Sequence, residues 1–405
     1  RDRSVSRGLG DVYKRQSPNS MQYEPNDQIG IPWDLNKIAQ LLFFISLSAT
    51  VVCLICARTK AKRWWTGGLG LLLSAVLLTG YFMPVSVPVM DLSTSGVFAD
   101  AAYYETIHAG KQQNVAADFR VKKYRLDFSM GLNLTGRAKV YVDRSELKSY
   151  RFTLYHGYKV KQVTDQTGAA LDFRREHDYV TVTRGEAAVE YLCLEYTGKS
   201  PKYYSSYAGV CLPANFAYYP IPGYRELFKD SFYGFIDCSL PYDTAFDVRC
   251  SGRKQMYCNL AARGDNHFAG NARSITLLSG YYDTLKLNDT LVVYPKYADT
   301  EIRARIKKNM GTFTKEHRDI RTIFIMDADN LTPYEHLRSY DGYVVTNSMI
   351  DMEQSYFESQ IDISKMDFYK TFVYYYNEKV DREELEQLKQ SEDPEEYPMV
   401  QIILK

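Results

Sequence analysis

The chain has 405 residues, enough for two or three domains and for a sizeable buried core. Its 50 lysines and arginines balance 49 aspartates and glutamates, which excludes both a global basic field for nucleic acid and an acidic excess for cationic partners. The 35 tyrosines and 19 phenylalanines are typical of β-rich extracytoplasmic modules and of carbohydrate or peptide grooves, and packing in cores and interfaces is the simpler interpretation.

The front of the chain does not look like natural protein sequence. Residues 6–16, SRGLGDVYKRQ, resemble the read-through translation of a transposase-based sequencing adapter, a contaminant of assembled metagenomes. We therefore expect residues 1–20 to be an artefactual, disordered leader and exclude them from reasoning about the fold. The natural chain then starts at Met21, with an extracytoplasmic segment over 21–37, or it is the tail of a longer bacterial protein.

A transmembrane hairpin is predicted over residues 38–90. Residues 38–57 and 64–83 carry no charge, and each run is about as long as a helix that crosses the hydrocarbon core. The short loop between them, 58–63, holds four basic residues, Arg58, Lys60, Lys62 and Arg63. By the positive-inside rule this loop is cytoplasmic, so the large part of the chain after the hairpin is expected to be extracytoplasmic.

The first apolar segment has a cleavable signal peptide as its alternative interpretation. A signal peptide needs a basic flank in front of it, but acidic residues outweigh Lys37 there. In the second segment, Gly67, Gly68 and Gly70 would let another helix approach closely.

After a linker over 91–118, apolar residues alternate with polar ones from Tyr124 to Leu134, which predicts a half-buried strand. The pattern resumes after Gly136, so a hairpin or tight bend is expected there. Further strands are predicted at 150–155, 160–164, 179–183 and 189–196. Short strands at this spacing favour an antiparallel β-sandwich over 119–298 and disfavour a nucleotide-binding α/β sheet.

The pattern changes after residue 299. Ile302, Ile306, Met310 and Phe313 recur at helical spacing, and strands are predicted at 322–326 and 343–345. We therefore expect a smaller α+β part over 299–405. The acidic run at 378–396 is expected to be a solvated helix or tail.

A family resemblance covers about residues 124–350. It is carried by four short stretches in order, Tyr124-x-Leu126-x-Phe128, Leu192-x-Leu194-x-Tyr196-x-Gly198, Ala217-Tyr218-Tyr219-Pro220 and Tyr257-Cys258-Asn259. Together they resemble the N-terminal β-sandwich of the aminopeptidase N family, zinc peptidases of the gluzincin type. The arrangement also looks like a bacterial subset in which such a domain is fused behind the membrane helices of an ABC transporter permease. The resemblance then implies further permease helices and an ABC ATPase subunit as partners, with 299–405 as a remnant of the catalytic-type domain.

The zinc motif of that family does not occur in this sequence. In the family, H-E-x-x-H on a helix of the next domain supplies two histidine ligands and a glutamate base. The chain has six histidines, and no two of them are four residues apart. The substrate-gripping Gly-Ala-Met-Glu-Asn stretch is also absent, and Gly342–Met349 stand near its expected place. We therefore assign no catalytic residue, metal ligand or cofactor.

Sequence motifs for other catalytic or binding chemistry are few. No G-x-S-x-G nucleophile turn occurs, and Asp327-Ala-Asp329-Asn330 is better interpreted as a strand-end turn than as a calcium loop. One or two disulfides would be compatible with the cysteine count, for instance among Cys238, Cys250 and Cys258. Candidate contacts to a peptide or glycan are five tyrosines, Tyr203, Tyr204, Tyr207, Tyr218 and Tyr219.

Three functional hypotheses follow. The first is a non-catalytic, aminopeptidase-like outer domain, anchored in the lipid bilayer of the cell membrane, which acts in binding or assembly within an ABC permease or its accessory subunit. The second is a fragment of an active zinc aminopeptidase whose motif lies beyond the chain end. The third is a stand-alone surface receptor or glycan-binding or peptide-binding module.

Overall fold

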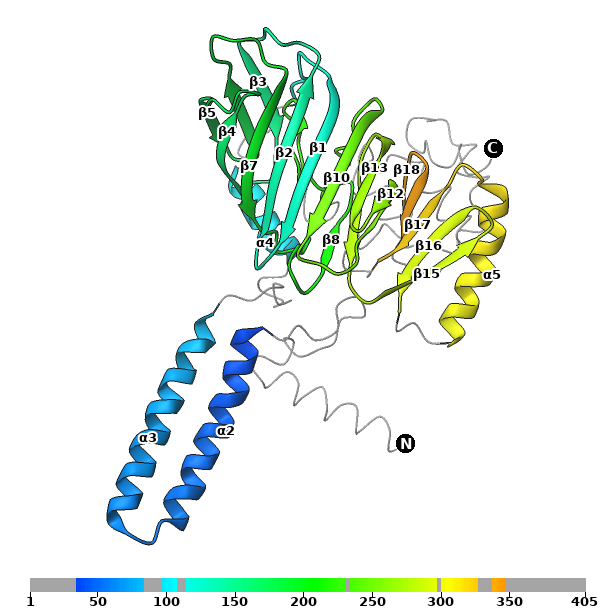
Figure 1. Cartoon of the computed structure of the whole chain (residues 1–405). Helices are drawn as coiled ribbons and strands as arrows, with labels where there is room; N and C mark the ends of the chain where they lie inside the picture. Colours follow the sequence, from blue (N-terminus) through cyan, green and yellow to red (C-terminus); the bar gives the residue numbers. More distant parts are fainter. Residues whose placement is uncertain are drawn as a thin grey trace, which may run out of the picture.

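The structure is a computed structural model, and it describes residues 34–83, 96–107, 114–229, 234–296, 300–326 and 337–346. Two long helices extend from one end of a β-rich body (Figure 1). The leader predicted at 1–20 and the acidic run at 378–396 lie outside the described residues. The expectation of a mainly β protein is confirmed.

The first of the two long helices is strongly apolar. α2 (Leu35–Cys56) is, among the described helices, the one that is long and apolar enough to cross a membrane, with a mean hydropathy of 2.4 in its most apolar window. α3 (Lys60–Thr79) does not pass the same test, and a short 3-10 helix, η2 (Gly80–Phe82), follows it. Of the two predicted membrane spans, the first is therefore confirmed as an apolar helix of sufficient length, and the second is not.

The second helix begins earlier than its apolar run suggests. It starts at Lys60, because the side chain of Thr59 accepts a hydrogen bond from the backbone N–H of Lys62 and caps the helix. Lys60, Lys62 and Arg63 thus lie in the first turns of α3 and not in the loop predicted at 58–63. These charges lower the hydropathy of the helix.

Small side chains let α2 and α3 lie side by side (Figure 1). A Cβ at Gly70 would lie 2.0 Å from Thr50 Oγ1, and one at Gly80 would lie 2.4 Å from Ala39 Cβ. The hydroxyls of Ser46 and Ser74 are 3.1 Å apart, at hydrogen-bond distance. Close backbone approach of this kind is typical of helix pairs in membranes.

The β-rich body is built on a seven-stranded sheet with the order β12-β13-β10-β1-β2-β7-β4. Its strands are β1 (Val121–Met130), β2 (Leu134–Val142), β4 (Tyr158–Thr164), β7 (Tyr191–Gly198), β10 (Thr244–Ser251), β12 (Ala261–Gly264) and β13 (His267–Ala272). All neighbours are antiparallel except β1 and β10, which are parallel. The predicted strands at 160–164 and 189–196 are therefore confirmed to within two residues.

The first hairpin turns at a different place from the one predicted. The chain reverses at Gly131–Asn133, where the N–H of Gly131 donates to the carbonyl of Asn133, so the pattern from Tyr124 to Leu134 spans two strands. Gly136 lies inside β2, where the lack of a side chain leaves space for the Tyr196 ring. A Cβ there would come within 2.4 Å of the Tyr196 ring on the neighbouring strand.

Two smaller sheets face the seven-stranded sheet. One has the order β5-β6-β3-β9 and consists of β3 (Ser149–Thr153), β5 (Phe173–Glu176), β6 (Tyr179–Thr183) and β9 (Ile221–Pro222). The other has the order β11-β14-β8 and consists of β8 (Val210–Leu212), β11 (Tyr257–Cys258) and β14 (Leu277–Ser279). Their inward side chains join those of the large sheet in one hydrophobic core.

The outer face of the large sheet is a ladder of charges. Arg137 on β2 pairs with Glu195 on β7 at 3.0 Å, and Asp247 on β10 accepts contacts from Arg125 and His267 at 3.6 and 2.9 Å. Cross-strand pairs of opposite charge suit a solvated sheet face.

A five-stranded sheet forms the remainder of the body, in the order β15-β16-β17-β19-β18. Its strands are β15 (Tyr282–Leu287), β16 (Thr290–Pro295), β17 (Thr322–Ile325), β18 (Leu337–Tyr340) and β19 (Tyr343–Thr346). β15 and β16 belong to this sheet although they fall inside the range expected for the sandwich, because β16 pairs in parallel with β17.

Helix α5 (Thr300–Glu316) covers one face of this sheet (Figure 1). Ile306, Met310 and Phe313 are buried in a second core with Ile323 and Val344. The opposite face of the sheet, including Phe324 and Tyr343, contacts the main core. Because both faces are covered, β17 and β19 are continuous apolar runs.

The segment 213–220, which joins β8 to β9, has no regular secondary structure and is buried at every position. Buried backbone carbonyls need hydrogen-bond partners. Here tyrosine hydroxyls supply them, since Tyr196 donates to the carbonyl of Tyr218 and Tyr124 donates to that of Pro220, each at 2.8 Å. Tyr218 in turn donates to the carbonyl of Ile275 at 2.8 Å. Tyr124, Tyr196 and Tyr218 are therefore core residues whose hydroxyls complete buried backbone bonding.

The cysteines proposed as disulfide partners are thiols. Cys238, Cys250 and Cys258 form no disulfide. Burial raises the pKa of the Cys238 and Cys258 thiols to about 12 in each case, so both remain protonated at neutral pH.

We expect Tyr196→Phe to lower the free energy of unfolding by about 1 to 3 kcal/mol, because it leaves the carbonyl of Tyr218 buried without its donor. Chemical denaturation of the full chain in detergent, followed by tyrosine fluorescence, measures this change. The matched control is Tyr141→Phe, on the solvated face of the same sheet, which should leave the midpoint nearly unchanged. Equal effects of the two substitutions would contradict the assignment.

Candidate functional site

Four of the five candidate tyrosines are buried. Tyr203, Tyr204, Tyr218 and Tyr219 are 1, 6, 0 and 1% exposed, whereas Tyr207 is 39% exposed. The structure does not gather them on one surface. Contact with a peptide or glycan through these residues stays a prediction.

Tyr207 lies where the β-rich body meets the start of α2. Its hydroxyl donates to Asp34 Oδ1, immediately before the helix, and its carbonyl accepts from Arg253. The most exposed of the five candidate tyrosines therefore helps to hold the apolar helix against the body.

The densest polar cluster lies elsewhere, around the loop 154–158. Arg175 on β5 holds this loop, donating to the carbonyls of Leu154 at 3.0 Å, of Tyr155 at 2.9 Å and of Tyr158. It also donates to the carbonyl of His177 at 2.9 Å. One guanidinium thus fixes both the loop and the turn between β5 and β6.

His156, at the centre of this loop, lies between two buried carboxylates. Its Nδ1 is 3.4 Å from Asp178 Oδ1, and its Nε2 is 3.9 Å from Asp100 Oδ1. The backbone N–H of His156 also donates to Asp178 Oδ1 at 2.6 Å. Asp100 and Asp178 are 1 and 5% exposed. The imidazole forms ion pairs with them only when it is protonated.

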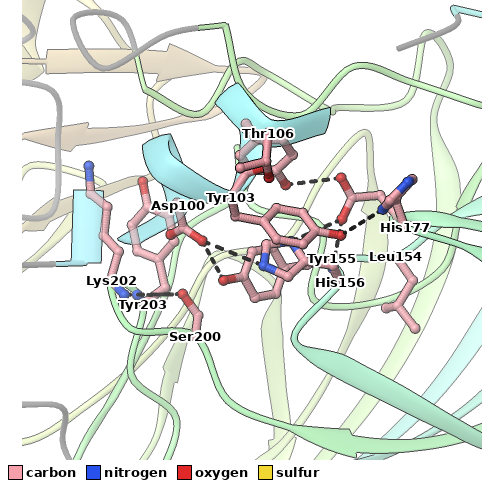
Figure 2. A network of polar contacts seen from close by, with 12 residues as sticks. Asp100, Tyr103, Thr106, Leu154, Tyr155, His156, His177, Ser200, Lys202 and Tyr203 are labelled. Atoms are coloured by element: carbon pink, nitrogen blue, oxygen red, sulfur yellow. Dashed lines mark hydrogen bonds and ion pairs between the residues drawn. The ribbon is translucent and has the colours of Figure 1, made fainter. Parts of the chain in front are cut away.

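Helix α4 (Gly96–Ile107) brings Asp100 and two tyrosines to this cluster. Figure 2 shows Tyr103 beside His156, and the two rings are stacked with centroids 3.5 Å apart. The hydroxyl of Tyr103 is 3.1 Å from His177 Nδ1, and that of Tyr104 donates to Asp178 Oδ2 at 3.0 Å. Asp100, Tyr103 and Tyr104 of α4 therefore all contact the cluster around His156.

Asp100 has an unusual environment for a carboxylate. Burial raises its pKa to about 7, and the negative charge of Asp178 adds to this, although donation by Tyr155 and the positive charge of Lys202 lower it. Tyr155 O–H donates to Asp100 Oδ1 at 2.6 Å, while Oδ2 is buried without a hydrogen-bond partner. A proton on Oδ2 removes the cost of a buried charge.

The protonation of Asp100 changes near neutral pH, because burial raises its pKa to about 7. Within the described residues, no group of three or more His, Cys, Asp or Glu side chains is placed to hold a metal ion. We accordingly assign no cofactor to the cluster.

No short motif in the sequence could have found this cluster. Asp100 falls in the predicted linker and is 55 residues from Tyr155, while Asp178 is 22 residues from His156. The one local signal is a polar residue, Asp100, among apolar neighbours on α4. The segments meet only because α4 folds back onto the β-rich body.

No family model matches the chain, and no curated protein matches it. Among solved structures, yeast LTA4 hydrolase in complex with bestatin is 10% identical over 60% of this chain and 44% of its own, with a TM-score of 0.40. The M1 zinc metallopeptidase of Deinococcus radiodurans is 12% identical over 60% of this chain and 62% of its own, with a TM-score of 0.38. The match thus spans less than two thirds of either structure.

We expect the stability of the chain to fall as the pH rises from about 4 to about 7. Free aspartate releases its proton near pH 3.9, but folded Asp100 keeps it to about pH 7, so the folded state binds more protons in this window. The contribution of Asp100 is a loss of up to about 1.4 kcal/mol per pH unit. Above pH 7 this contribution is constant.

Denaturation of the full chain at several pH values tests this. Asp100→Asn removes the titrating group and should flatten the profile relative to the parent chain, whereas Glu146→Gln, at an exposed carboxyl, should leave it unchanged. Parallel profiles for the parent chain and Asp100→Asn would contradict the role of Asp100.

Proposed function

We propose that the chain is a membrane-anchored module whose β-rich body lies on the extracytoplasmic side and acts in binding or assembly, as part of an ABC transporter permease or its accessory subunit. The observation that carries the proposal is the apolar surface of α2. Phe44, Ile45 and Ile55 are 64, 55 and 74% exposed along one helix. An apolar surface of this extent favours a lipid environment over water.

The packing of α2 disfavours both a core helix and a signal sequence. A core helix of a globular body would be mostly buried, but only 17% of the apolar window of α2 is. A signal sequence would leave the protein, but α2 packs along α3 through Thr50 and Gly70 and through the Ser46–Ser74 contact. This pairing supports a permanent anchor in which α3 is the second span.

The charge distribution supports an orientation. Arg58, Lys60, Lys62 and Arg63 are all exposed at the end of the helix pair away from the body. Trp64 and Trp65 follow them and are 82 and 81% exposed, as expected for an aromatic belt. With the basic end in the cytoplasm, the β-rich body lies on the other side.

Binding or assembly is favoured over peptide hydrolysis by the residues of this chain. The six histidines include no pair with H-E-x-x-H spacing. Family resemblance in four sequence motifs motivates an aminopeptidase-like scaffold, and the motif residues Tyr124, Tyr196 and Tyr218 serve as core hydrogen-bond donors. In the permease interpretation, the lipid-facing sides of α2 and α3 would meet further helices.

We expect protease added outside intact bacterial spheroplasts to digest the β-rich body of the full chain, and protease added to inverted vesicles to spare it. Changing Arg58, Lys60, Lys62 and Arg63 together to glutamine should yield a mixed orientation, because the charge bias across the membrane is lost. Immunoblotting of the protected fragments measures the fraction in each orientation.

The matched control removes four positive charges from the body, by changing Lys122, Lys148, Lys159 and Lys161 to glutamine. These residues lie far from the helices in the chain and should not alter orientation. Extraction of the parent chain by alkaline carbonate would contradict a membrane anchor. Stoichiometric zinc binding with cleavage of aminoacyl reporters by the purified full chain would contradict a binding role.

A further inference from the structure

Helix α4 occupies the junction between the helix pair and the β-rich body. It begins 14 residues after Phe82, the last residue of η2, so movement of the helix pair reaches the body along the chain through α4. Figure 1 shows α4 against the end of the body from which the two long helices extend. The contacts that dock α4 therefore link the two parts, alongside the hydrogen bond between Tyr207 and Asp34 at the start of α2.

Those contacts are both polar and aromatic, and they converge on one place. Asp100 accepts from Tyr155, and Tyr104 donates to Asp178. Tyr103 stacks on His156, and the Tyr104 ring stacks on Phe228 with centroids 4.9 Å apart. Loss of a proton from Asp100 places a buried charge among these contacts.

Burial of Asp100 and the negative charge of Asp178 favour the protonated form of Asp100, whereas the hydrogen bond from Tyr155 and the positive charge of Lys202 oppose it. The titratable and charged groups that face Asp100 and His156 are Tyr103 and Tyr104 of α4, Tyr155 of the loop, Tyr158 of β4, Arg175, His177 and Asp178 of the β5–β6 hairpin, and Lys202 after β7. The hydrogens of Arg175 are donated to backbone carbonyls. An ionised Asp100 would leave a charge on Oδ2, which is buried without a hydrogen-bond partner.

We propose that α4 is a proton-controlled latch, which is docked while Asp100 holds a proton and is released when that proton leaves. Docked α4 couples the helix pair to the β-rich body. Release of α4 removes this link and leaves the contact between Tyr207 and Asp34. The latch needs only the described contacts and does not depend on which side of a membrane the body faces.

The direction of the pH dependence follows from the pKa of Asp100 while α4 is docked. Burial raises the pKa of docked Asp100 to about 7, while an undocked aspartate has an ordinary value near 3.9. The docked state therefore holds the extra proton between these values, and the equilibrium for release rises about tenfold per pH unit from about pH 4 to about pH 7. Above pH 7 it levels off.

Hydrogen exchange of the full chain in detergent micelles tests the latch. We expect amides of residues 96–107 to exchange at least tenfold faster at pH 7.5 than at pH 5, after correction for the intrinsic effect of pH on exchange. Amides of β1 provide the internal reference for global opening and should keep their protection. The combination distinguishes local release of α4 from unfolding of the whole domain.

Two variants sharpen the test. Asp100→Asn should make exchange of α4 independent of pH in this window, whereas Glu105→Gln, at an exposed carboxyl of the same helix, should keep the response of the parent chain. If Asp100→Asn does not fold, His156→Gln serves instead and should weaken protection of α4 at pH 5. Equal corrected exchange of α4 at pH 5 and 7.5, or equal changes in α4 and β1, would overturn the proposal.

Discussion

The structure depends on the burial of the irregular segment 213–220, between β8 and β9, in its core. A segment without regular hydrogen bonding is normally found at the surface, because its backbone polar groups have few partners inside a protein. Here those groups are bonded by side chains and by neighbouring loops. The hydroxyls of Tyr124 and Tyr196 reach across the core to the carbonyls of Pro220 and Tyr218. The aromatic composition is a consequence of this arrangement, since tyrosine fills a core and also carries a donor.

The same segment supports the cluster around His156. The N–H of Tyr155 donates to the carbonyl of Ala217 at 3.0 Å, and the rings of Tyr155 and Phe216 have centroids 4.8 Å apart. Arg175 holds the other side of the loop through its carbonyls. The loop is thus held from both sides, and the two carboxylates meet the imidazole in a rigid setting. A site with this support can keep a carboxyl in an unfavourable, dry environment.

Particular elements explain where prediction from sequence succeeded. The strand expected at 179–183 coincides with β6, and the helix expected from Ile306, Met310 and Phe313 is α5, because period-two and helical spacings directly reflect which side is buried. The first hairpin was misplaced because Gly136 was interpreted as a turn residue. A glycine is required at this position because a Cβ there would collide with the Tyr196 ring on the neighbouring strand. This contact between strands cannot be read from the local sequence.

The candidate site was less accessible to prediction. The tyrosine clusters looked alike in sequence, but four of the five are buried and only Tyr207 is substantially exposed. The cluster of Asp100, His156 and Asp178 combines a predicted linker with two loops. Burial of each carboxyl depends on the path of segments that are distant in the chain, so no local pattern could report it.

By itself, the sequence determined the apolar helix at the front, the basic residues at the end of the helix pair and the β-rich character of the body. Each of these follows from local composition or periodicity, which can be recognised within one helix or one strand. Only the tertiary structure decided that β15 and β16 join the parallel strands, that tyrosine hydroxyls bond a buried segment, and that α4 places Asp100 beside His156. These are long-range contacts, and their energies arise from burial and hydrogen bonding between segments that the sequence keeps apart.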